Sequence, residues 1–443
     1  MKETLFETAK TVLLNNWTGA FTKPAPNLYP HQWNWDAGFI ALGYAHFDLD
    51  KAEQELRSLF RGQWSTGMLP QIIFGQEKEA QYFPGPSFWQ TQRAQAAPDS
   101  PLTSGISMPA VHGFILWRIY QIAAAKDEER AIRLLKEFFP KIYHLHQYFY
   151  TYRDPNQEGL VYIRHPWEGG TDNSPIWDSV LARIKVEELD IPPYQRKDLQ
   201  KPDAAKHRPT NLDYDRYVYL VDLFRKNQYD DLAIYEKCPF LIQDPLFNAI
   251  LIWSNESLIK IGHLLGEDVS ELISWNELSI YSMNEKLWDA ERGMYNAYDL
   301  ANDQLIEVHT SSGLMPMIGE VPTQEQAEQM LLTLEGPAFQ LNHPDFYTCP
   351  TYSLTAANID YQKYWRGPIW INMNWLLYHG LLRYDMEEAA QIIKQNSLAL
   401  IKEFGFHEYF DPRKKEVENL ACGTDQFSWT AALCIDLLAE DEF

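Results

Sequence analysis

Apolar side chains recur at helical spacing along most of this chain. Residues at positions i, i+3, i+4 and i+7 share one face of an α-helix, and such a face is buried by packing against another element. Strand-like runs are few and short, as at residues 159–163 and 404–410. The pattern predicts helices over residues 3–15, 36–46, 49–64, 111–125, 128–152, 177–190, 213–229, 245–265, 268–290, 323–335, 367–383, 386–404 and 424–440.

These predicted helices follow one another in antiparallel-looking pairs, and long loops rich in aromatic residues occupy alternate junctions. No linker rich in Pro, Gly and Ser divides the chain. We therefore expect residues 1–443 to form a single domain, an all-α (α/α)6 barrel, with the functional loops gathered at one end. The alternative is an open helical solenoid, although the sequence has no repeat of constant period.

Charge and cysteine usage limit the class of protein. The formal net charge is -23 and no basic block offsets it, which argues against nucleic acid and anionic membranes as partners. Cysteines 238, 349, 422 and 434 lack CxxC or zinc-type spacing, so we expect reduced thiols. No apolar run has the length of a signal peptide or a transmembrane helix. We expect a soluble, cytoplasmic protein, and a homo-oligomer is compatible with the sequence.

Aromatic residues are abundant, with 15 Trp, 25 Tyr and 22 Phe. Many of them alternate with polar residues in four loops, which read YPHQWNWD, QYFPGPSFW, YQKYWRGPIW and EFGFHEYFDP. Aromatic faces bind the C–H faces of sugars, and the neighbouring polar groups satisfy sugar hydroxyls. The alternative is that large aromatics fill a large core, and both uses are expected here. The clustering favours a carbohydrate site.

One irregular loop, residues 165–178, contains three acidic groups, two tryptophans, two prolines and consecutive glycines. A carboxyl group beside tryptophan loses water, which raises its pKa toward that of a general acid. Our candidate for the acid is Asp172. The alternative is that Asp172 or Asn173 caps the helix that follows.

A second carboxyl group, Glu408, lies in an aromatic segment near the C-terminus. Hydrolysis of a glycoside with inversion needs a protonated acid and an ionised carboxylate, roughly 6.5–9.5 Å apart, that activates water. Asp172 and Glu408 fit these two roles, since a closed barrel returns the end of the chain to its start. The alternative for Glu408 is a surface glutamate on a short strand. Rival acids are Glu168, Asp178, Glu403 and Glu416.

Three further polar residues have two readings each. Asp36 follows Trp35 and is either a sugar ligand or a helix N-cap. Arg366 clamps hydroxyls or a carboxylate, or pairs with a structural acid, and its loop setting favours the site. Arg216 binds a carboxylate of the ligand, or forms a surface ion pair with a neighbouring aspartate.

Motifs for metals and nucleotides are weak. His407-Glu408 is not part of HExxH, because Asp411 occupies the second histidine position. The segment that begins at Asp154 resembles a calcium loop, but its twelfth residue is His165, so a turn stabilised by Asp and Asn side chains is the better account. GxSxG, P-loop and strand-preceded GxGxxG motifs are missing from the sequence. We expect no metal and no cofactor.

Several long motifs resemble a known family. They are YPHQWNWDAGF, LRSLFRGQWSTGMLPQIIF, YFPGPSFW, TSGISMP, HPWEGGTDNSPIWD, YWRGPIWINMNWLL, GFHEYFDP and FSWTAAL. From about residue 29 to the C-terminus, the chain is similar to the inverting α-glycosidases that include processing α-glucosidase I, with the bacterial mannosylglycerate and glucosylglycerate hydrolases as the nearest branch. More distant relatives are trehalases and glucoamylases.

The resemblance implies an (α/α)6 barrel, with Asp172 as general acid and Glu408 as general base. It implies a sugar subsite near Trp35, Asp36, Trp365, Arg366 and Trp370, and aglycone contacts around Tyr214, Arg216, Tyr217 and Gln426. Further substrate contacts are expected at Tyr29, Trp33, Gln71, Tyr82, Trp167, Gly367 and Trp429.

Two positions depart from the family pattern. Gly169 stands where the family usually has Ser, and Met108 stands where it usually has Gln. An amide lost beside a hydroxyl changes which sugar epimer is satisfied. The expected function is hydrolysis of a small α-glucoside or α-mannoside, with glucosylglycerate or mannosylglycerate preferred. The alternatives are a trehalase or oligosaccharide α-glucosidase, and a catalytically inactive sugar-binding barrel.

Overall fold

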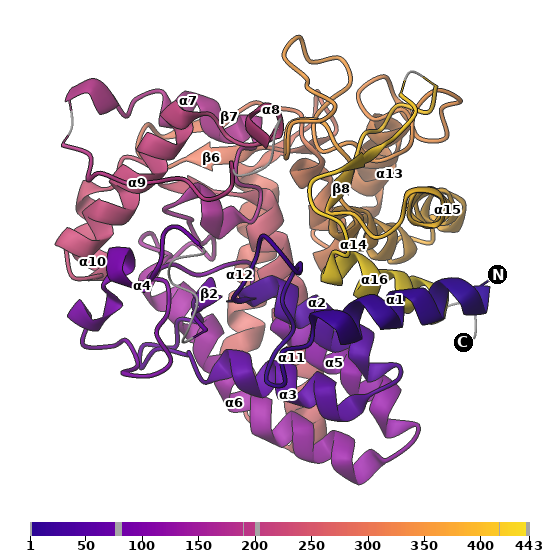
Figure 1. Ribbon diagram of the computed structural model, residues 1–443, viewed down its shortest axis with the longest axis horizontal. Coiled ribbons are helices and arrows are strands. Elements are labelled where there is room, and N and C mark those ends of the chain that lie inside the picture. Colours follow the sequence, from indigo (N-terminus) through magenta and orange to yellow (C-terminus); the bar gives the residue numbers. More distant parts are fainter. Residues whose placement is uncertain (1, 76–81, 189, 200–203, 416, 440–443) are drawn as a thin grey trace. The chain divides into compact units, whose positions relative to one another are not determined.

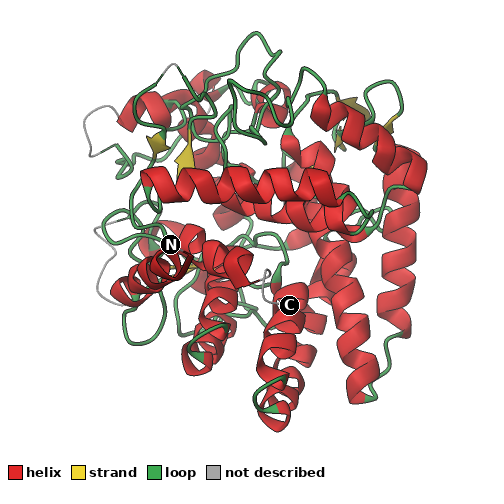
Figure 2. Ribbon diagram, turned by 90° about the vertical axis from the view of Figure 1, so that its right-hand side faces the viewer, coloured by secondary structure: helices red, strands yellow, loops and turns green. Residues whose placement is uncertain are grey.

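The computed structural model describes residues 2–75, 82–188, 190–199, 204–415 and 417–439. Helices joined by long loops dominate it, and its strands are two or three residues long (Figures 1 and 2). The chain forms two compact units, Met1–Gly159 with Leu251–Ser279 and Thr424–Phe443, and Leu160–Ile250 with Ile280–Gly423. Within the described ranges, no helix is long and apolar enough to cross a membrane.

Helical pairs build the first unit. Helix α2 packs against α3, α5 and α16, while α5 packs against α6. Helices α1 and α16, from opposite ends of the chain, lie side by side (Figure 1). The elements of this unit are α1 (Lys2–Asn16), β1 (Gln32–Trp33), α2 (Asn34–Ala45), α3 (Leu49–Phe60), β2 (Ile72–Ile73), α4 (Pro86–Trp89), η2 (Thr91–Arg93), α5 (His112–Ala124), α6 (Glu128–Tyr152) and α16 (Ser428–Ala439).

The sequence of α6 shows why these helices form. Asp127 precedes the helix and its carboxylate accepts a hydrogen bond from the backbone N–H of Arg130, which satisfies one of the free donors at the N-terminus. Glu128 and Glu129 in the first turn favour the positive end of the helix dipole. Buried residues then recur every three or four positions, including Ala131, Leu134, Leu135, Phe138, Phe139, Ile142, Leu145 and Phe149.

The second unit mixes helices with the small antiparallel sheets β3-β6-β7, β4-β5 and β8-β9. The first unit contains the sheet β1-β2. Helix α14 packs against α15 and η6. The helices are η3 (Pro166–Gly169), η4 (Pro175–Trp177), α7 (Asp178–Leu181), η5 (Val186–Glu188), α8 (Ala204–His207), α9 (Asn211–Lys226), α10 (Asp231–Lys237), η6 (Ser311–Gly319), α13 (Gln324–Glu335), α14 (Ile371–Leu382) and α15 (Glu387–Phe404). The strands are β3 (Ile242–Gln243), β4 (Trp288–Asp289), β5 (Met294–Tyr295), β6 (Ala297–Asp299), β7 (Gln304–Ile306), β8 (Tyr409–Phe410) and β9 (Ala421–Cys422). The chain passes between the units at residues 159–160 and 423–424, and within α11 (Pro245–Leu265) and α12 (Ser270–Lys286).

Most predicted helices are confirmed within a few residues, and 245–265 coincides with α11. The prediction of one helix over 177–190 is wrong, because α7 ends at Leu181. Tertiary contacts override the local pattern there: Arg183 pairs with Asp299 at 2.6 Å, and Ile184 is buried. The strand-like run at 159–163 forms only a single bridge, between Ile163 and Ile242.

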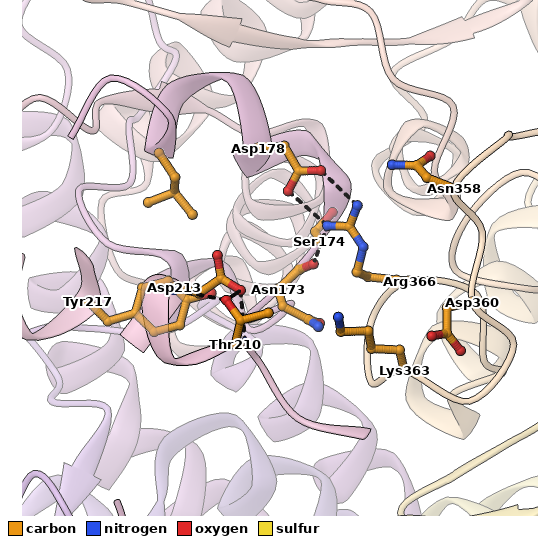
Figure 3. Close-up of a pocket in the computed structure, with 11 residues that line it drawn as sticks. Asn173, Ser174, Asp178, Thr210, Asp213, Tyr217, Asn358, Asp360, Lys363 and Arg366 are labelled. Atoms are coloured by element: carbon orange, nitrogen blue, oxygen red, sulfur yellow. Dashed lines mark hydrogen bonds and ion pairs between the residues drawn. The ribbon is translucent and has the colours of Figure 1, made fainter. Parts of the chain in front are cut away.

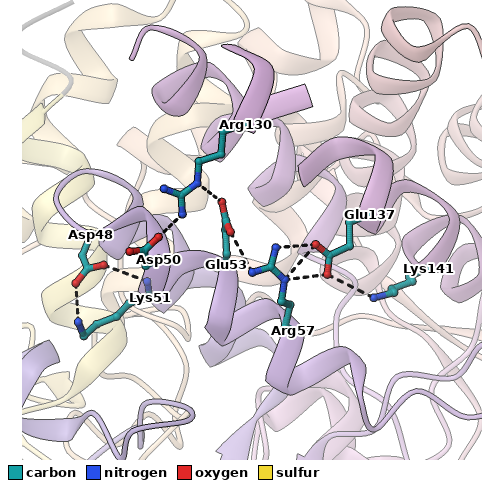
Figure 4. A network of polar contacts seen from close by, with 8 residues as sticks. All are labelled: Asp48, Asp50, Lys51, Glu53, Arg57, Arg130, Glu137 and Lys141. Atoms are coloured by element: carbon teal, nitrogen blue, oxygen red, sulfur yellow. Dashed lines mark hydrogen bonds and ion pairs between the residues drawn. The ribbon is translucent and has the colours of Figure 1, made fainter. Parts of the chain in front are cut away.

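A chain of ion pairs joins α3 to α6 in the first unit (Figure 4). Its centre is Glu53, whose side chain is only 9% exposed and contacts Arg130 at 2.6 Å and Arg57 at 3.0 Å. Glu53→Ala is expected to lower the free energy of unfolding by about 2 kcal/mol, since Arg130 and Arg57 both lose a buried carboxylate partner. Urea denaturation measures this change.

The matched control for Glu53 is Glu7→Ala, which removes an exposed pair with Lys10 within helix α1 of the same unit. Exposed pairs contribute little, so this variant is expected to unfold at the wild-type urea concentration. Equal midpoints for the two variants would show that the network does not stabilise the first unit.

Candidate active site

The loop that contains Asp172 lies in the second unit between η3 and η4. Gly170 has φ 73°, which lets the chain reverse after η3. The cap of η4 is Ser174, whose hydroxyl accepts a hydrogen bond from the N–H of Ile176 at 3.4 Å. The capping role considered for Asp172 and Asn173 is therefore wrong, and the Asp172 carboxyl is available for chemistry.

Three consecutive backbone carbonyls of this loop accept hydrogen bonds from side chains. The indole N–H of Trp177 donates to the carbonyl of Thr171 at 2.8 Å, and the hydroxyl of Tyr217 donates to the carbonyl of Asp172 at 2.8 Å. A guanidinium N–H of Arg366 donates to the carbonyl of Asn173 at 3.3 Å. The backbone on both sides of the Asp172 side chain is thus held in place.

The environment of Asp172 favours its protonated form. Burial raises the pKa of this carboxyl to about 7, the nearby charges of Glu408 and Asp198 also raise it, and Arg208 opposes them. A carboxylic acid that is still protonated near neutral pH is a suitable proton donor. Glu408, although 236 positions away along the chain (408 − 172), is close enough for its charge to act on Asp172.

Glu408 immediately precedes β8 and is only 1% exposed. A guanidinium N–H of Arg208 donates to its Oε2 at 3.0 Å, and because arginine is always charged, this contact pairs the Glu408 carboxylate with a cation. The alternative of a surface glutamate is wrong. Arg208 also lies over the ring of Tyr364, with 4.5 Å between its Cζ and the ring centroid.

Arg208 is a functional candidate that the sequence analysis missed. It follows α8, where Pro209 prevents the helix from continuing, and it is 7% exposed. No local motif distinguishes it from the other arginines of the chain. Its importance comes from acting on both carboxyl groups, through an ion pair with Glu408 and through its charge at Asp172.

Gly423, beyond β9, also escaped the sequence analysis. Its φ is +74°, and a Cβ built there would lie 2.5 Å from Oε2 of Glu408 and 2.7 Å from the Glu408 Cβ. Only glycine permits this backbone conformation together with such a close approach.

Gly423→Ala is expected to lower kcat by about 10- to 100-fold, because the new methyl group displaces the Glu408 carboxylate from Arg208. Steady-state kinetics on the preferred glycoside measures the loss. The control is Gly266→Ala, at a glycine with φ +76° and open space around the added Cβ. This control is expected to retain wild-type kcat, and an equal loss in both variants would exclude a specific effect on Glu408.

The rival acids have other roles. Glu168 is buried and accepts a hydrogen bond from the N–H of Arg164 at 2.7 Å. Asp178 pairs with Arg366, and Glu403 is exposed on α15. Glu416 lies outside the described residues. Asp172 and Glu408 stay the predicted pair.

A stack of aromatic rings lies next to Glu408 in the second unit. The rings of Trp365 and Trp370 are parallel within 5° and their centroids are 3.8 Å apart, and Tyr409 stacks on Trp370 at 4.8 Å. Trp365 and Trp370 are at most 2% exposed, so they also serve as core. Gly367 is required for packing, since a Cβ would lie 2.6 Å from the carbonyl oxygen of Asp360.

A second aromatic cluster surrounds the other side of the Asp172 loop. Trp167 packs edge-on against Tyr214 and Tyr217, with centroid distances of 6.0 and 5.5 Å. Burial lowers the pKa of His165 to about 4, so its neutral ring accepts from the N–H of Trp167 and donates to the carbonyl of Tyr217. Arg216 forms the ion pair with a neighbouring aspartate that the sequence analysis considered. Its partner is Asp213, and the N–O distance is 3.7 Å.

The remaining candidates lie in the first unit. Trp35 contacts Trp429 edge-on at 5.3 Å, and Trp33 contacts Tyr29 and Tyr82 at 5.2 and 5.1 Å. The structure therefore collects these five rings into neighbouring clusters. Their use as substrate contacts stays a prediction.

The polar candidates of the first unit are Asp36, Gln71 and Gln426. Asp36 is 4% exposed in the first turn of α2, where Trp33 is the N-cap, so the capping alternative is wrong. The buried Oε1 of Gln71 has no hydrogen-bond partner among the described residues, which suits a group that binds a ligand. Gln426 is exposed, and its backbone carbonyl accepts from the Asn16 amide at 2.8 Å.

A cavity of about 350 Å³ adjoins the Asp172 loop within the second unit. Figure 3 shows Arg366 between the carboxylate of Asp178 and the backbone of Asn173 at its wall. Arg366 thus has the structural partner considered in the sequence analysis, with N–O distances of 2.8 and 2.7 Å to Asp178. The other lining residues are Ser174, Leu181, Thr210, Asp213, Tyr217, Asn358, Asp360 and Lys363.

The segment considered as a calcium loop is a turn. The carboxylate of Asp154 accepts hydrogen bonds from the N–H groups of Glu158 and Gly159, at 3.0 and 2.7 Å. In the part of the chain that the structure describes, no cluster of His, Cys, Asp and Glu has the arrangement of a metal site.

A carboxyl group whose pKa is raised to about 7, near a second carboxyl group that pairs with an arginine, is the arrangement that acid–base hydrolysis needs. The comparison with known proteins agrees: residues 29–430 match the model of the mannosylglycerate hydrolase MGH1-like glycoside hydrolase domain. The chain belongs to this family and is a glycoside hydrolase.

Curated relatives cover nearly the whole chain. The mannosylglycerate hydrolase of Rubrobacter radiotolerans is 41% identical over 99% of this chain and 97% of its own. The glucosylglycerate hydrolase of Mycolicibacterium hassiacum is 33% identical over 97% of this chain and 96% of its own.

The fold has a solved counterpart in the GH63 mannosylglycerate hydrolase from Thermus thermophilus, crystallised in complex with Tris and D-glycerate. The two structures align with a TM-score of 0.87 and 39% identity, over 97% of this chain and 99% of the other. The predicted fold class, an all-α (α/α)6 barrel, is confirmed.

Proposed function

We propose that this glycoside hydrolase cleaves an α-glycoside of glycerate, with mannose or glucose as the sugar, and inverts the anomeric carbon. Asp172 is the general acid and Glu408 the general base. The observation that supports this proposal best is the contrast between the two carboxyl groups. Asp172 has a pKa raised to about 7, while Glu408 is paired with Arg208 as a carboxylate.

In the proposed reaction, Asp172 donates its proton to the glycosidic oxygen while the bond from that oxygen to the anomeric carbon breaks. Glu408 accepts a proton from a water molecule whose oxygen attacks the anomeric carbon from the opposite face. The aglycone leaves as a neutral hydroxyl group and the sugar has the inverted configuration. Afterwards Asp172 is ionised and Glu408 protonated, and both exchange protons with solvent.

Glycerate is proposed as the aglycone for two reasons. The relatives named above are a mannosylglycerate and a glucosylglycerate hydrolase, and the Thermus structure was crystallised with D-glycerate. Within this chain, Arg208 places a buried positive charge beside both catalytic carboxyl groups, where the carboxylate of an aglycone is stabilised. Arg208, which pairs with Glu408 at 3.0 Å, and Arg216, which pairs with Asp213 at 3.7 Å, are both candidates for this contact.

The test is a panel of pure glycosides followed by NMR. We expect mannosylglycerate or glucosylglycerate to be hydrolysed at least about 100-fold faster than trehalose or maltose, since the neutral aglycones have no carboxylate to interact with the cationic groups of the site. The β-anomer of the sugar should appear first, before mutarotation. Release of the α-anomer, or a preference for trehalose, would contradict the proposal. Sugar binding without turnover on any glycoside would favour an inactive sugar-binding barrel.

We place the protein in the cytoplasm. Its cysteines at 238, 349, 422 and 434 are all buried free thiols, the state expected in a reducing compartment. The homo-oligomer stays a prediction.

A further inference from the structure

The Asp172 loop is fastened at its C-terminal side by one short segment, residues 365–366. The backbone N–H of Trp365 donates to Oδ1 of Asn173 at 2.9 Å, and Arg366 donates to the Asn173 carbonyl at 3.3 Å. The same guanidinium binds both carboxylate oxygens of Asp178 at 2.8 and 2.7 Å. Arg366 therefore joins the residue after the proposed acid to the first residue of α7 (Figure 3).

We propose that Asp178 and Arg366 are positioning residues: their ion pair holds the Asn173 backbone and thereby aims the Asp172 carboxyl at the glycosidic oxygen. This inference rests on the proposed role of Asp172 as the general acid. A proton donor must meet its acceptor at hydrogen-bond distance, and a misplacement of about 1 Å costs roughly 100-fold in rate.

The position of Asn173 leaves one of its buried polar atoms without a hydrogen-bond partner among the described residues. Its side chain is 5% exposed, and because Oδ1 faces the N–H of Trp365, the buried Nδ2 has no hydrogen-bond partner in the described residues. A buried donor without a partner is unfavourable. Such an arrangement persists where the backbone position matters more than local satisfaction of polar groups.

The ion pair itself contributes little to stability. The Asp178 side chain is 50% exposed, and pairs with an exposed partner are weak because solvent screens them. The charges that shift the pKa of Asp172 belong to Arg208, Glu408 and Asp198, and the hydroxyl of Tyr217 binds its carbonyl. The charged and titratable groups that act on Arg366 include Asp178, Tyr352 and Asp213, and Asp360 and Lys363 line the same cavity. The pair therefore acts on Asp172 through the backbone of Asn173.

The experiment compares Asp178→Asn with a matched control, Glu320→Gln. Glu320 pairs with Arg383 at 3.0 Å in the same unit, and the exposed fractions of this pair, 58% and 16%, resemble the 50% and 15% of Asp178 and Arg366. Each variant is assayed on the preferred glycerate glycoside and on the α-fluoride of the same sugar. Fluoride needs little help from a general acid to leave, so it reports on the rest of the site.

For Asp178→Asn we expect kcat on the glycerate glycoside to fall by at least about 10-fold, KM to change by less than about three-fold, and the rate on the fluoride to stay within about three-fold of wild type. The alkaline limb of the pH profile should move to lower pH, because a displaced Asp172 is less buried. Asp178→Glu should recover part of the loss. Glu320→Gln should leave every value unchanged.

The proposal is overturned if Asp178→Asn behaves as Glu320→Gln does, or if both substrates lose rate equally. Arg366→Lys keeps the positive charge but loses the bidentate ion pair with Asp178. This variant provides the same comparison if Asp178→Asn does not fold. Asp172→Asn is assayed alongside. Wild-type turnover in Asp172→Asn would instead remove the proposed function itself, so the two failures are distinguishable.

Discussion

Asp172→Asn is expected to lower kcat on the glycerate glycoside by about 10³-fold, because asparagine is isosteric with the acid but has no acidic proton to transfer. The rate on the α-fluoride of the same sugar should fall by less than about 10-fold, since that leaving group needs no acid. Stopped assays with both substrates measure the contrast. Equal losses on the two substrates would exclude Asp172 as the acid.

The pH dependence follows from the same residue. Burial raises the pKa of Asp172 to about 7, so its proton is present below that pH and lost above it. The wild-type rate should therefore decline as pH rises through about 7. The sign for stability is the same: a raised pKa of a carboxyl group means that the folded state binds more protons than the unfolded state, and stability falls as pH rises from about 4 to 7.

Asp172→Asn removes this loss of stability at higher pH, because the asparagine side chain does not ionise. At pH 8 the variant should be more stable than the wild type, by on the order of 1–2 kcal/mol in urea denaturation. At pH 4 the two proteins should unfold at similar urea concentrations. An inactive variant that is also more stable cannot owe its inactivity to misfolding, so this measurement is the control for the kinetic loss.

Glu408→Gln is expected to lower kcat by about 10³-fold on the glycerate glycoside and on the α-fluoride alike, because both reactions need an activated water molecule. This pattern is opposite to that of Asp172→Asn and separates the base from the acid. Removal of the Glu408 charge should also lower the pKa of Asp172, since Glu408 raises it, and the alkaline limb of the residual activity should move to lower pH.

The control for Glu408→Gln is Glu403→Gln, at an exposed rival five positions earlier (408 − 403). It should leave kcat, KM and the pH profile unchanged. A loss of activity in Glu403→Gln, together with retained activity in Glu408→Gln, would move the assignment of the base to Glu403.

Periodicity predicted the helices well where burial of one face dominates, as in α6 and α11. It failed over 177–190, where the ion pair of Arg183 with Asp299 and the burial of Ile184 end the helix after one turn. The acid loop was predictable from its composition, because acidic, aromatic and glycine residues together are unusual inside regular elements. The alternative, that Asp172 or Asn173 caps the following turn, is wrong, and Ser174 has that role.

By itself, the sequence determined the helical class, the Asp172 loop, the Glu408 segment and the family, because these depend on local patterns and long motifs. Only the tertiary structure decided that Arg208 pairs with Glu408, that Gly423 makes room for that carboxylate, and that Arg366 binds Asp178 and Asn173. These contacts join residues distant along the chain. The aromatic neighbours of Asp172 in the sequence predicted that its pKa is raised, but the charges of Arg208, Glu408 and Asp198 that also act on this pKa come together only on folding.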